Sequence, residues 1–554
     1  MPIKKLILFY PFILFLSGNV FSQAPNWLYA KSIGGSNYEE SKALTIDGNG
    51  NVFMVGTFKS SSLAVGTYTF NNTSSYSSND IIIVKYDPNG NLLWAKKFGN
   101  LSSDWINSAA VDGNGNLYVT GAFFNDPLTI ETTTLSNNGD GDIFIVKFDP
   151  NGNLLWAKSF GGGGFDEGRG LDIDGSGNIY LTGGFGSSSI AFGTATLTNT
   201  YSSSFFLVKF DSNGSELWAK KVGENCNGTS ITLSDIQGSI WITGEHCGAI
   251  IGSTTLNCIS FPDIFVTKLD LNGYVIWTKG FGGNNSDYPN DISFDANGNV
   301  YVVGSFRSDS LALSSSTLLL SGTGAFPNMF IVKFDSNGND LWAKKVGGNS
   351  SESANGIVED GNGNVTVTGY YGSSSVAFGT ITVYNSPGSN EIFLVNYDAN
   401  GNAMWVKTAG GSQSDYSYNI AKDAFGNYYI SGSFMSNDLT IGTTTLNHAG
   451  NGDIFIAKLG SSVTENSNLT NEQINPINLF PNPSSGQVTI SFHQPFSSSV
   501  TGIEIYNVLG EKIYSMKHPV NIQTLDLSLY SEGLYYVQVL TEEKTYNRKL
   551  IICK

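Results

Sequence analysis

The chain has 554 residues, including 65 glycines, 4 cysteines and 4 histidines, and its 29 basic and 46 acidic residues give a net charge of −17. This charge argues against nucleic acid and anionic membrane surfaces as partners, because both require clusters of lysine and arginine. A hydrophobic content of 40% excludes a disordered polar chain. Four histidines leave little room for histidine-based metal or acid–base chemistry, and the length predicts several domains or a repeat array.

The first predicted element is a secretory signal peptide over residues 1–22. Lys4 and Lys5 precede an apolar run at residues 6–16, which is shorter than a membrane-spanning helix needs. Cleavage is predicted after Ser22, and an uncleaved anchor is the alternative. Since no other stretch approaches the roughly 18 apolar residues of a transmembrane helix, we expect an exported chain with no transmembrane segment.

A period of about sixty residues dominates residues 23–460. Each repeat carries three markers. The first is a tryptophan, which is followed two residues later by lysine in the second to seventh repeats. The second is a Gly-Asn turn, and the third is a run similar to Asp-Ile-Phe-Ile-Val-Lys-Phe. Such regular recurrence indicates a repeat architecture in which each unit is one supersecondary element. The marker tryptophans are Trp27, Trp94, Trp156, Trp218, Trp277, Trp342 and Trp405.

Each repeat holds four predicted strands, represented in the second repeat by residues 109–112, 117–120, 143–148 and 154–158. The third strand is apolar at consecutive positions, as expected of a strand buried on both faces between stacked sheets. Asn-Gly turns supply the positive φ that a tight hairpin needs. Four antiparallel strands repeated seven times, without a helical pattern, predict an all-β fold that contains a seven-bladed β-propeller.

The ends of the repeat region predict how the ring closes. The region begins with a fourth strand at residues 26–33 and ends with a third strand at residues 453–459. We therefore expect the first strand to complete the last blade, and an open solenoid is the alternative. Each repeat also has a further predicted hairpin between its second and third strands, as at residues 128–135. This hairpin lies on the same face of the ring as the connections between repeats, which makes that face the candidate binding face.

That face carries a partial ring of carboxylates beside aromatic residues. Ten residues after the marker tryptophan stand Asp104, Asp166, Asp287, Glu352 and Asp415, and the first and fourth repeats have Asn37 and Gly228 there. The aromatic residues that follow directly are Tyr38, Trp105, Tyr288 and Tyr416. Carboxylates beside aromatic rings can hold a cation or bind a sugar, which makes these residues the candidate ligand site. The alternative is a turn device that accepts backbone hydrogen bonds in every repeat.

No recognisable catalytic set accompanies these carboxylates. The sequence has no Gly-x-Ser-x-Gly elbow in a strand–turn–helix context and no His-Glu-x-x-His run, so we predict no catalytic residue, no metal ligand and no cofactor. Two alternatives stay open. Two carboxylates at working distance would suit a glycoside hydrolase or lyase. The Asp-x-Asn-Gly-Asn turns resemble calcium loops superficially, although they lack the glutamate of an EF-hand.

Three of the four cysteines, Cys226, Cys247 and Cys258, lie in the fourth repeat. If Gly252 and Ser253 form the two-residue turn of its extra hairpin, Cys247 and Cys258 are directly opposed across the strands. Cross-strand neighbours lie within reach of a disulfide, and a disulfide suits an exported protein. We therefore predict a Cys247–Cys258 disulfide, with Cys226 either unpaired or competing for Cys247.

A change of composition marks the C-terminal part of the chain. Residues 461–474 are polar and unpatterned, which predicts a linker. Residues 475–554 contain short alternating runs, as at 488–492, 503–506 and 535–539, which predict a small Ig-like β-sandwich.

The C-terminal segment also carries four motifs in a fixed order. They are Leu-Phe-Pro-Asn-Pro-Ser-Ser-Gly at 479–486, Ile-Tyr-Asn-Val-Leu-Gly at 505–510, a late motif at 525–537 and a terminal strand at 549–554. Together they resemble the type A C-terminal sorting domain of the type IX (Por) secretion system. An ordinary Ig-like adhesion module is the alternative. The principal motif residues are Pro481, Asn482, Pro483, Gly486, Gly510 and Gly533.

This resemblance implies that the type IX machinery recognises residues 475–554. It also implies passage across the outer membrane of a Bacteroidota-type bacterium, followed by release or attachment to the cell surface. The repeats at residues 24–460 resemble the SBBP family of bacterial β-propeller repeats.

The predicted function is therefore a secreted or surface-located, non-enzymatic propeller that binds an extracellular protein or glycan. A carbohydrate-active enzyme that uses the carboxylates, and a purely structural surface component, are the alternatives. The fold alone does not decide between them.

Overall fold

A computed structural model describes residues 24–460, apart from 75–77, 236, 261, 322–325 and 386–387, and residues 477–552, apart from 481–483, 485, 493–499, 508–510, 518–521, 532 and 542–544. The predicted signal peptide at 1–22, the linker at 461–474 and the motif residues Pro481, Asn482, Pro483 and Gly510 lie outside the described residues. The described strands fall into two compact units, divided after residue 462. Every regular element in these ranges is a strand, so none of them offers a helix that could cross a membrane.

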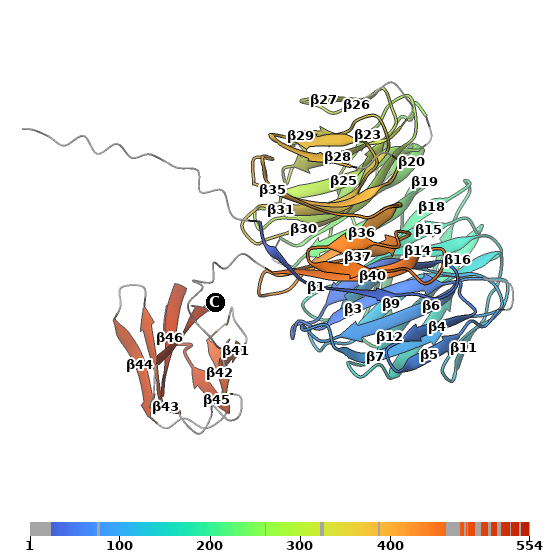
Figure 1. The fold of residues 1–554 in the computed structure, drawn as a ribbon. Coiled ribbons are helices and arrows are strands. Elements are labelled where there is room, and N and C mark those ends of the chain that lie inside the picture. The colour runs from blue at the N-terminus through green and yellow to red at the C-terminus, as the bar shows by residue number, and fades with distance from the viewer. Residues whose placement is uncertain are drawn as a thin grey trace, which may run out of the picture. The chain divides into compact units, whose positions relative to one another are not determined.

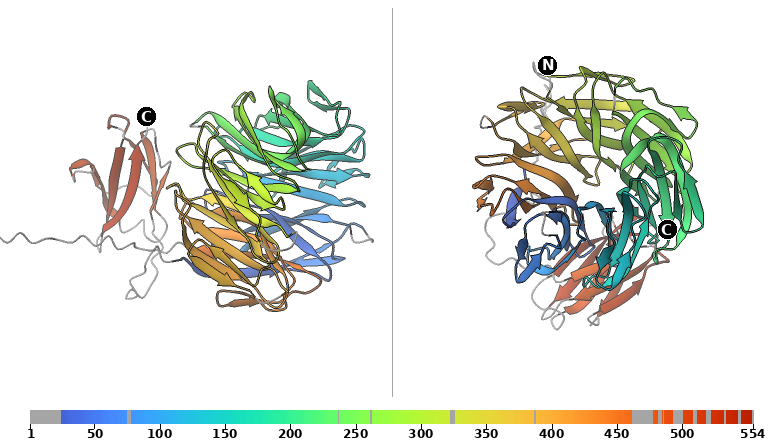
Figure 2. Two further views of the ribbon diagram at one scale, coloured as in Figure 1. Left: turned by 90° about the horizontal axis from the view of Figure 1, so that it is seen from above. Right: turned by 90° about the vertical axis from the view of Figure 1, so that its right-hand side faces the viewer.

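The first unit consists of antiparallel sheets around a central axis, and Figures 1 and 2 show this arrangement. Each innermost strand contacts the innermost strands of the two neighbouring sheets. Two sheets are β2 (Glu39–Ile46), β3 (Val52–Phe58), β6 (Asp80–Tyr86) and β7 (Leu92–Phe98), and β8 (Asp104–Val111), β9 (Leu117–Phe124), β12 (Gly141–Phe148) and β13 (Leu154–Phe160). Two more are β24 (Asp287–Phe294), β25 (Val300–Phe306), β28 (Asn328–Phe334) and β29 (Asp340–Val346), and β30 (Glu352–Glu359), β31 (Val365–Tyr371), β34 (Glu391–Tyr397) and β35 (Ala403–Ala409).

The two ends of the repeat region share one sheet. Its strands are β36 (Asp415–Lys422), β37 (Tyr428–Phe434), β40 (Asp453–Gly460) and β1 (Asn26–Ile33). Because β1 pairs with β40, the first strand of the unit completes its last sheet, as the ends of the repeat region predicted. The innermost strand β36 also contacts β2, so the circle of innermost strands is closed. This is the architecture of a β-propeller.

The remaining large sheet has eight strands. They are β14 (Asp166–Ile173), β15 (Ile179–Phe185), β18 (Ser204–Phe210), β19 (Glu216–Ser234), β20 (Ser239–Ile251), β21 (Thr254–Thr255), β22 (Asp263–Asp270) and β23 (Val275–Phe281). The 19-residue strand β19 pairs first with β18 and then with β20. It therefore continues from the outer edge of one four-stranded group into the axis of the next.

Short hairpins lie between the second and third strands of the five four-stranded sheets, and between β15 and β18 of the eight-stranded sheet. They are β4 (Ser62–Val65) with β5 (Tyr68–Asn71), β10 (Leu128–Ile130) with β11 (Thr133–Leu135), β16 (Ser189–Phe192) with β17 (Ala195–Thr198), β26 (Ser310–Ala312) with β27 (Thr317–Leu319), β32 (Ser375–Phe378) with β33 (Ile381–Tyr384), and β38 (Leu439–Ile441) with β39 (Thr444–Leu446). These are the extra hairpins that the spacing of the repeats predicted.

The core of the first unit lies between neighbouring sheets. The third strands β6 and β12 are buried at every residue, which explains their uninterrupted apolar sequences. Trp94 of one sheet packs in the same cluster as Phe144 of the next. Ile454 of the last sheet packs with Val52 of the first. Each sheet therefore depends on both neighbours for burial, and the closed arrangement leaves no sheet face without one.

The second unit contains two sheets around a separate core. One is formed by β41 (Ile477–Phe480), β42 (Gln487–Phe492) and β45 (Ile522–Asp526). The other is formed by β44 (Lys512–Lys517), β43 (Val500–Asn507), β46 (Gly533–Thr541) and β47 (Thr545–Ile552). Val488, Ile503, Val537 and Leu550 are among the buried residues of this core.

Candidate binding site in the central cavity

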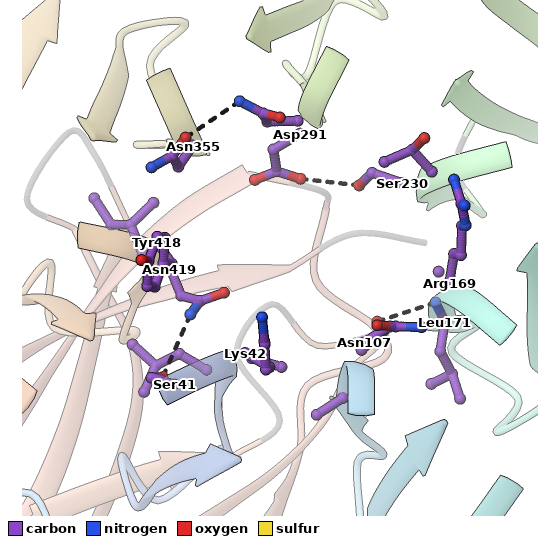
Figure 3. Close-up of a pocket in the computed structure, with 18 of the residues that line it drawn as sticks. Ser41, Lys42, Asn107, Arg169, Leu171, Ser230, Asp291, Asn355, Tyr418 and Asn419 are labelled. Atoms are coloured by element: carbon purple, nitrogen blue, oxygen red, sulfur yellow. Dashed lines mark hydrogen bonds between the residues drawn. The ribbon is translucent and has the colours of Figure 1, made fainter. Parts of the chain in front are cut away.

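The innermost strands enclose a cavity of about 380 Å³ on the axis of the first unit. Side chains from β2, β8, β14, β19, β24, β30 and β36 all line it, and Figure 3 shows them around one space. Concave sites with a few well-placed polar groups are the usual places for small ligands. The lining residues fall within 40–44, 107–109, 169–171, 229–231, 290–291, 355 and 418–420.

A β-bulge at one position of each innermost strand selects the side chains that reach this cavity. In β8 the pairing with β9 passes from Ile106 to Ser108, so Asn107 has no partner in the ladder. A bulge changes the direction of the side chain on its extra residue. We call these extra residues the bulge positions, and all of them line the cavity. They are Lys42, Asn107, Arg169, Thr229, Asn290, Asn355 and Tyr418.

Amide side chains at the bulge positions connect neighbouring sheets. Asn107 Nδ2 donates to the carbonyl oxygen of Gly168 at 2.9 Å, and Asn355 Nδ2 donates to that of Ser417 at 2.8 Å. Among the described residues, Asn107 makes only this side-chain hydrogen bond. An amide group has two N–H donors and a carbonyl acceptor, so Asn107 keeps a donor and an acceptor for a molecule in the cavity.

The basic side chains of the cavity are paired with acidic ones. Lys42 Nζ lies 2.8 Å from Glu40 Oε1. Arg169 forms ion pairs with Glu167 and Glu245. These pairs cancel the two positive charges that the bulge positions bring to the axis.

The acidic residue Asp291 is held by donors of three strands. Its carboxylate accepts hydrogen bonds from Ser230 Oγ at 2.9 Å, from the backbone N–H of Ile292 at 2.9 Å and from that of Ile357 at 3.0 Å. Burial raises the pKa of Asp291 to about 6. Since its carboxylate is occupied by these donors, Asp291 joins neighbouring strands, and the cavity offers amides and hydroxyls rather than an unpaired charge.

Aromatic side chains stand at the second residue of several innermost strands, which we call the rim positions. Glu40 occupies this position in β2 and lines the cavity. Trp105 and Tyr288 occupy it in β8 and β24, and 41% and 39% of their surfaces are exposed. Tyr416 occupies it in β36, with its ring stacked 6.1 Å from that of Tyr418. Three of the predicted aromatic residues therefore stand where the innermost strands begin.

A second cavity of about 280 Å³ shares Arg169 with the central one. Phe165, Glu167 and Asn227 also line it. Asn227 belongs to β19, the strand that lacks the loop found elsewhere between a fourth strand and the next innermost strand. The space around Arg169 therefore extends from the axis towards the junction of β14 with β19.

The predicted carboxylates lie in the interior. None of the five has any exposed surface. Ser308 Oγ donates to Asp287 at 2.7 Å, Ser187 Oγ donates to Asp166 at 2.6 Å, and Ser436 Oγ donates to Asp415 at 2.8 Å. The structure therefore separates these side chains from the aromatic residues beside them. It places them in the turn device that was the alternative interpretation. The five are Asp104, Asp166, Asp287, Glu352 and Asp415.

At two positions of this ring, the structure gives a different residue from the one found by counting ten residues after the marker tryptophan. In β1 the pairing shifts between Trp27 and Tyr29, and Tyr29 lies opposite Lys458 as Trp94 lies opposite Lys85 in the next sheet. Tyr29 is thus the true equivalent of the marker tryptophan. Ten residues after Tyr29 stands Glu39, which is buried and accepts a hydrogen bond from Ser60 Oγ at 2.5 Å. The first repeat therefore contributes Glu39 rather than Asn37.

The fourth repeat contributes a cysteine. Cys226 lies opposite His246 in the ladder of β19 and β20, as Asp104 lies opposite Phe123 in β8 and β9. The uninterrupted β19 shortens this repeat, which explains why a fixed count of ten residues led to Gly228. Cys226 is buried, and burial raises the pKa of its thiol well above the usual range.

The other two cysteines of this repeat lie side by side. The hairpin register pairs Ile250 with Thr255, which continues to Cys247 opposite Cys258. The two sulfur atoms are 3.1 Å apart, and both thiols are free in this structure. The predicted disulfide thus has its two partners in place.

The Asp-x-Asn-Gly-Asn turns use their carboxylates internally. Asp112 Oδ1 accepts from the backbone N–H groups of Asn114 and Asn116, and its Oδ2 accepts from Asn116 Nδ2 at 2.8 Å. The described residues contain no group of three or more histidine, cysteine, aspartate or glutamate side chains placed to hold a metal ion. The possibility of calcium stays a prediction from the sequence.

Sequence reasoning missed the bulge positions. In six of the seven innermost strands the bulge residue stands three positions after the first residue of the strand, as Asn107 follows Asp104, whereas Thr229 lies within the longer β19. The bulge residue is Lys, Asn, Arg, Thr or Tyr, and the residues on either side of it vary as well. The residue types therefore do not separate the bulge positions from their neighbours, and only the strand pairing identifies them.

Two known families match parts of the chain. Residues 478–553 match the family described as the secretion system C-terminal sorting domain. Residues 93–122 and 276–305 match the family described as the SBBP beta-propeller repeat. Both resemblances seen in the sequence are therefore confirmed: the chain carries β-propeller repeats and a C-terminal sorting domain.

The chain spans about a third of the length of the curated relatives it matches. It is 25% identical to an uncharacterized WD repeat-containing protein of Acanthamoeba polyphaga mimivirus over 505 residues, covering 74% of this chain and 36% of that protein. It is 26% identical to the regulatory protein FlaEY of Caulobacter vibrioides over 277 residues, covering 47% and 29% respectively.

Two solved structures to which the chain has a low similarity are the following. The Neurospora crassa Pan2 WD40 domain has a TM-score of 0.37 at 9% identity, with 75% of this chain and 88% of that chain covered. Hydrazine synthase of Kuenenia stuttgartiensis has a TM-score of 0.35 at 10% identity, with 64% and 79% covered.

Proposed function

We propose that the chain is exported by the type IX secretion system and acts as a non-enzymatic binding module whose seven-bladed propeller presents the central cavity to a glycan. The sorting domain at residues 478–553 points to export, and thus to a secreted or cell-surface protein. The blade count follows if β19 fuses two four-stranded blades into the eight-stranded sheet beside five separate ones. The two sheets of the second unit suit an Ig-like sandwich.

The observation that carries the proposal is the mixture of groups at the axis. Asn107 offers amide hydrogen bonds in the cavity, and the rim positions offer the exposed rings of Trp105 and Tyr288. A sugar has hydroxyl groups that bond to amides, and apolar faces that pack against aromatic rings. Asn107 lines the cavity, and Trp105 and Tyr288 stand two residues before lining residues of the same strands, so we expect a glycan that enters the cavity to reach both kinds of contact.

The charges favour a neutral glycan over an anionic one. Lys42 and Arg169, the basic bulge residues, are already engaged by acidic side chains. The whole chain carries a net charge of −17, which repels anions at low salt. A uronic or sulfated sugar would therefore have to break an ion pair before it gained one.

The carboxylates that the enzyme alternative named do not reach a substrate, because Asp104, Asp166, Asp287 and their equivalents have no exposed surface and accept hydrogen bonds from the protein. The acidic residues that line the cavity are Glu40 and Asp291, and they are engaged by Lys42 and by Ser230. We expect no turnover of a polysaccharide by the purified protein.

A glycan array probed with the labelled protein tests the proposal. We expect binding to neutral oligosaccharides. We expect Trp105→Ala to lower the affinity about threefold to tenfold, which is the usual contribution of one aromatic contact. Phe425→Ala is the matched control, because Phe425 is 68% exposed and stands in a turn at the opposite end of an innermost strand. Binding that survives Trp105→Ala, or an array without a neutral ligand, would contradict the proposal.

A further inference from the structure

Neighbouring sheets meet where the third strand of one and the innermost strand of the next both begin. The backbone N–H of Asp104 donates to the carbonyl oxygen of Asn79, the residue before Asp80, at 3.0 Å. The N–H of Asp287 donates in the same way to Pro262, the residue before Asp263, at 2.8 Å. These bonds place the first residues of the two strands side by side at each junction.

Five such junctions have an acidic residue on both sides. At one of them, Glu391 beside Asp415, Glu391 is only partly buried. At the other four, all eight residues are 3% exposed or less. Two adjacent carboxylates that are shielded from water cannot both ionise without a large cost in free energy. These four pairs are Glu39 with Asp453, Asp80 with Asp104, Asp142 with Asp166, and Asp263 with Asp287.

One member of each pair accepts hydrogen bonds or an ion pair from several donors, although burial raises the pKa of Glu39, Asp166 and Asp287 as well. Ser60, Ser187 and Ser308 donate their hydroxyls to Glu39, Asp166 and Asp287. At the remaining junction the arrangement is reversed, because Lys97 Nζ lies 2.9 Å from Asp80 while Asp104 accepts only from the backbone N–H of Asn100.

The other member of each pair has a carboxyl oxygen without a partner. Among the described residues, no hydrogen-bond donor reaches Oδ1 of Asp104, Asp142, Asp263 or Asp453, and Oδ1 of Asp80 likewise has none. An unpaired buried oxygen is costly for a carboxylate, whereas a protonated carboxyl group becomes a donor to the acid beside it. The hydrogen-bonded member of each pair can accept a bond from a proton, and the member with an unpartnered oxygen can carry that proton.

A further junction carries an amide in place of one acid. Asn328 replaces the aspartate there, beside Glu352, and both residues are fully buried. The side-chain amide of asparagine has the shape of a protonated aspartate and is also neutral with a donor group. Among the described residues Asn328 Nδ2 has no hydrogen-bond acceptor, so this junction supplies the neutral group without the bond that a shared proton would make.

We propose that each of the four acid pairs binds one proton, shared between the two carboxyl groups, and that these protons join neighbouring sheets of the ring. The occupant is a proton rather than a metal ion, because in three of the pairs the oxygens of one member are already occupied by hydroxyl and backbone donors, and in the fourth Lys97 pairs with Asp80. A calcium ion needs six to eight oxygen ligands.

The charged surroundings of the four pairs differ. The group facing Asp142 is Asp166, with Asn138 as its hydrogen-bond donor. His448 lies near Asp453, and the thiol of Cys258 lies near Asp263. Lys97 and Asp126 lie near Asp104.

Burial and the partner acid raise the pKa of the protonated member in every pair. The pKa rises to about 6 for Asp142, Asp263 and Asp453, and to about 8 for Asp104. A raised pKa means that the folded state keeps the proton up to a higher pH than the unfolded state does. The stabilisation is therefore complete below the ordinary aspartate pKa near 4, and it is lost as the pH rises through about 6.

Asp142→Asn tests the proposal, because it imitates the protonated acid at every pH and Asp142 has the simplest surroundings. We expect the full-length variant to melt at the same temperature as the parent near pH 4. Between pH 4 and pH 6 it should gain about 2 °C or more relative to the parent, and then keep that advantage. Infrared spectra of the parent at pH 5 should show a buried carboxylic-acid band that weakens in the variant.

Asp149→Asn is the control with the opposite sign. At Asp149 the effect of burial is outweighed by hydrogen bonds from Asn153 and Asn151, which lower its pKa. Its loss should therefore cost more stability at pH 7 than at pH 4. A pH-independent effect of Asp142→Asn would overturn the proposal. So would a calcium-dependent rise in the melting temperature of the parent that EDTA reverses and Asp142→Asn abolishes.

Discussion

At Asp287 and Tyr288, one step along a strand separates the interior of the protein from its rim. Asp287 has no exposed surface, whereas 39% of Tyr288 is exposed. Successive side chains of a strand point to opposite faces, so two neighbours that the sequence presents as one motif serve different purposes. The carboxylate fixes the start of the strand from inside, and the ring is available to a ligand.

The first prediction concerns the serine that holds this carboxylate. Ser308→Ala removes the hydroxyl that donates to Asp287 at 2.7 Å and leaves a buried acceptor short of a donor. We expect a loss of about 1–2 kcal/mol in the free energy of unfolding, measured by chemical denaturation. Ser374→Ala is the control, because Ser374 is exposed in the corresponding hairpin of the sheet that contains β31. Equal effects of the two substitutions would refute this role.

The second prediction concerns the cysteines. The sulfur atoms of Cys247 and Cys258 are 3.1 Å apart, and the exported protein meets an oxidising environment. We expect a Cys247–Cys258 link in peptide maps of the non-reduced protein. Cys226 should resist alkylation until the protein unfolds, because burial raises its thiol pKa and excludes reagent. Free thiols at both Cys247 and Cys258 would show that the pair does not form.

At the scale of elements, the marker tryptophan joins one sheet to the next. Trp94 Nε1 and Lys85 Nζ donate to the same carbonyl oxygen, that of Pro150 in a turn of the neighbouring sheet, at 3.1 and 3.0 Å. Lys458 of the last sheet donates to the corresponding oxygen of Pro88 in the first, at 2.9 Å. The bond that links consecutive sheets therefore also closes the circle.

The third prediction tests this closure. Deletion of residues 24–34 removes β1 and exposes the edge of β40, so we expect a clear fall in melting temperature by calorimetry. Lys458→Met keeps the chain length and removes only the donor to Pro88, and it should cost less than the deletion. An unchanged melting temperature after the deletion would mean that β1 does not hold the ring.

Much of the fold followed from the sequence because turn chemistry and burial impose clear patterns. Asn-Gly turns and the uninterrupted apolar third strands identified the four strands of each repeat. The fixed count from the tryptophan failed in two places, where the register of β1 shifts at Trp27 and where β19 continues without a loop. Counting along a chain cannot detect a bulge or a missing loop, because both change the register without changing the residue types.

The candidate site was harder to predict for a physical reason. The residues that line the cavity are the bulge positions, such as Asn107 and Arg169, and their direction depends on a break in strand pairing. The sequence instead drew attention to acids that recur in nearly every repeat. Regular recurrence here reflects a structural requirement that nearly every sheet shares, whereas nothing in the residue types marks the positions that face the cavity.

At the scale of the whole molecule, the net charge of −17 sets the fourth prediction. A neutral glycan in a cavity with paired charges should bind with an affinity that changes by less than about twofold between low and high salt, since screening acts on charges. A uronic oligosaccharide of equal length should bind more weakly at low salt and gain from added salt. A steep loss of neutral-glycan affinity with salt would contradict the neutral-ligand proposal.

The most direct test of the central claim is a crystal structure of the protein with the tightest-binding neutral oligosaccharide. We expect density for the sugar in the central cavity, within hydrogen-bond distance of Asn107 and against the ring of Trp105 or Tyr288. Density for the sugar on the outer hairpins, or at the opposite ends of the innermost strands, would show that the cavity is not the binding site.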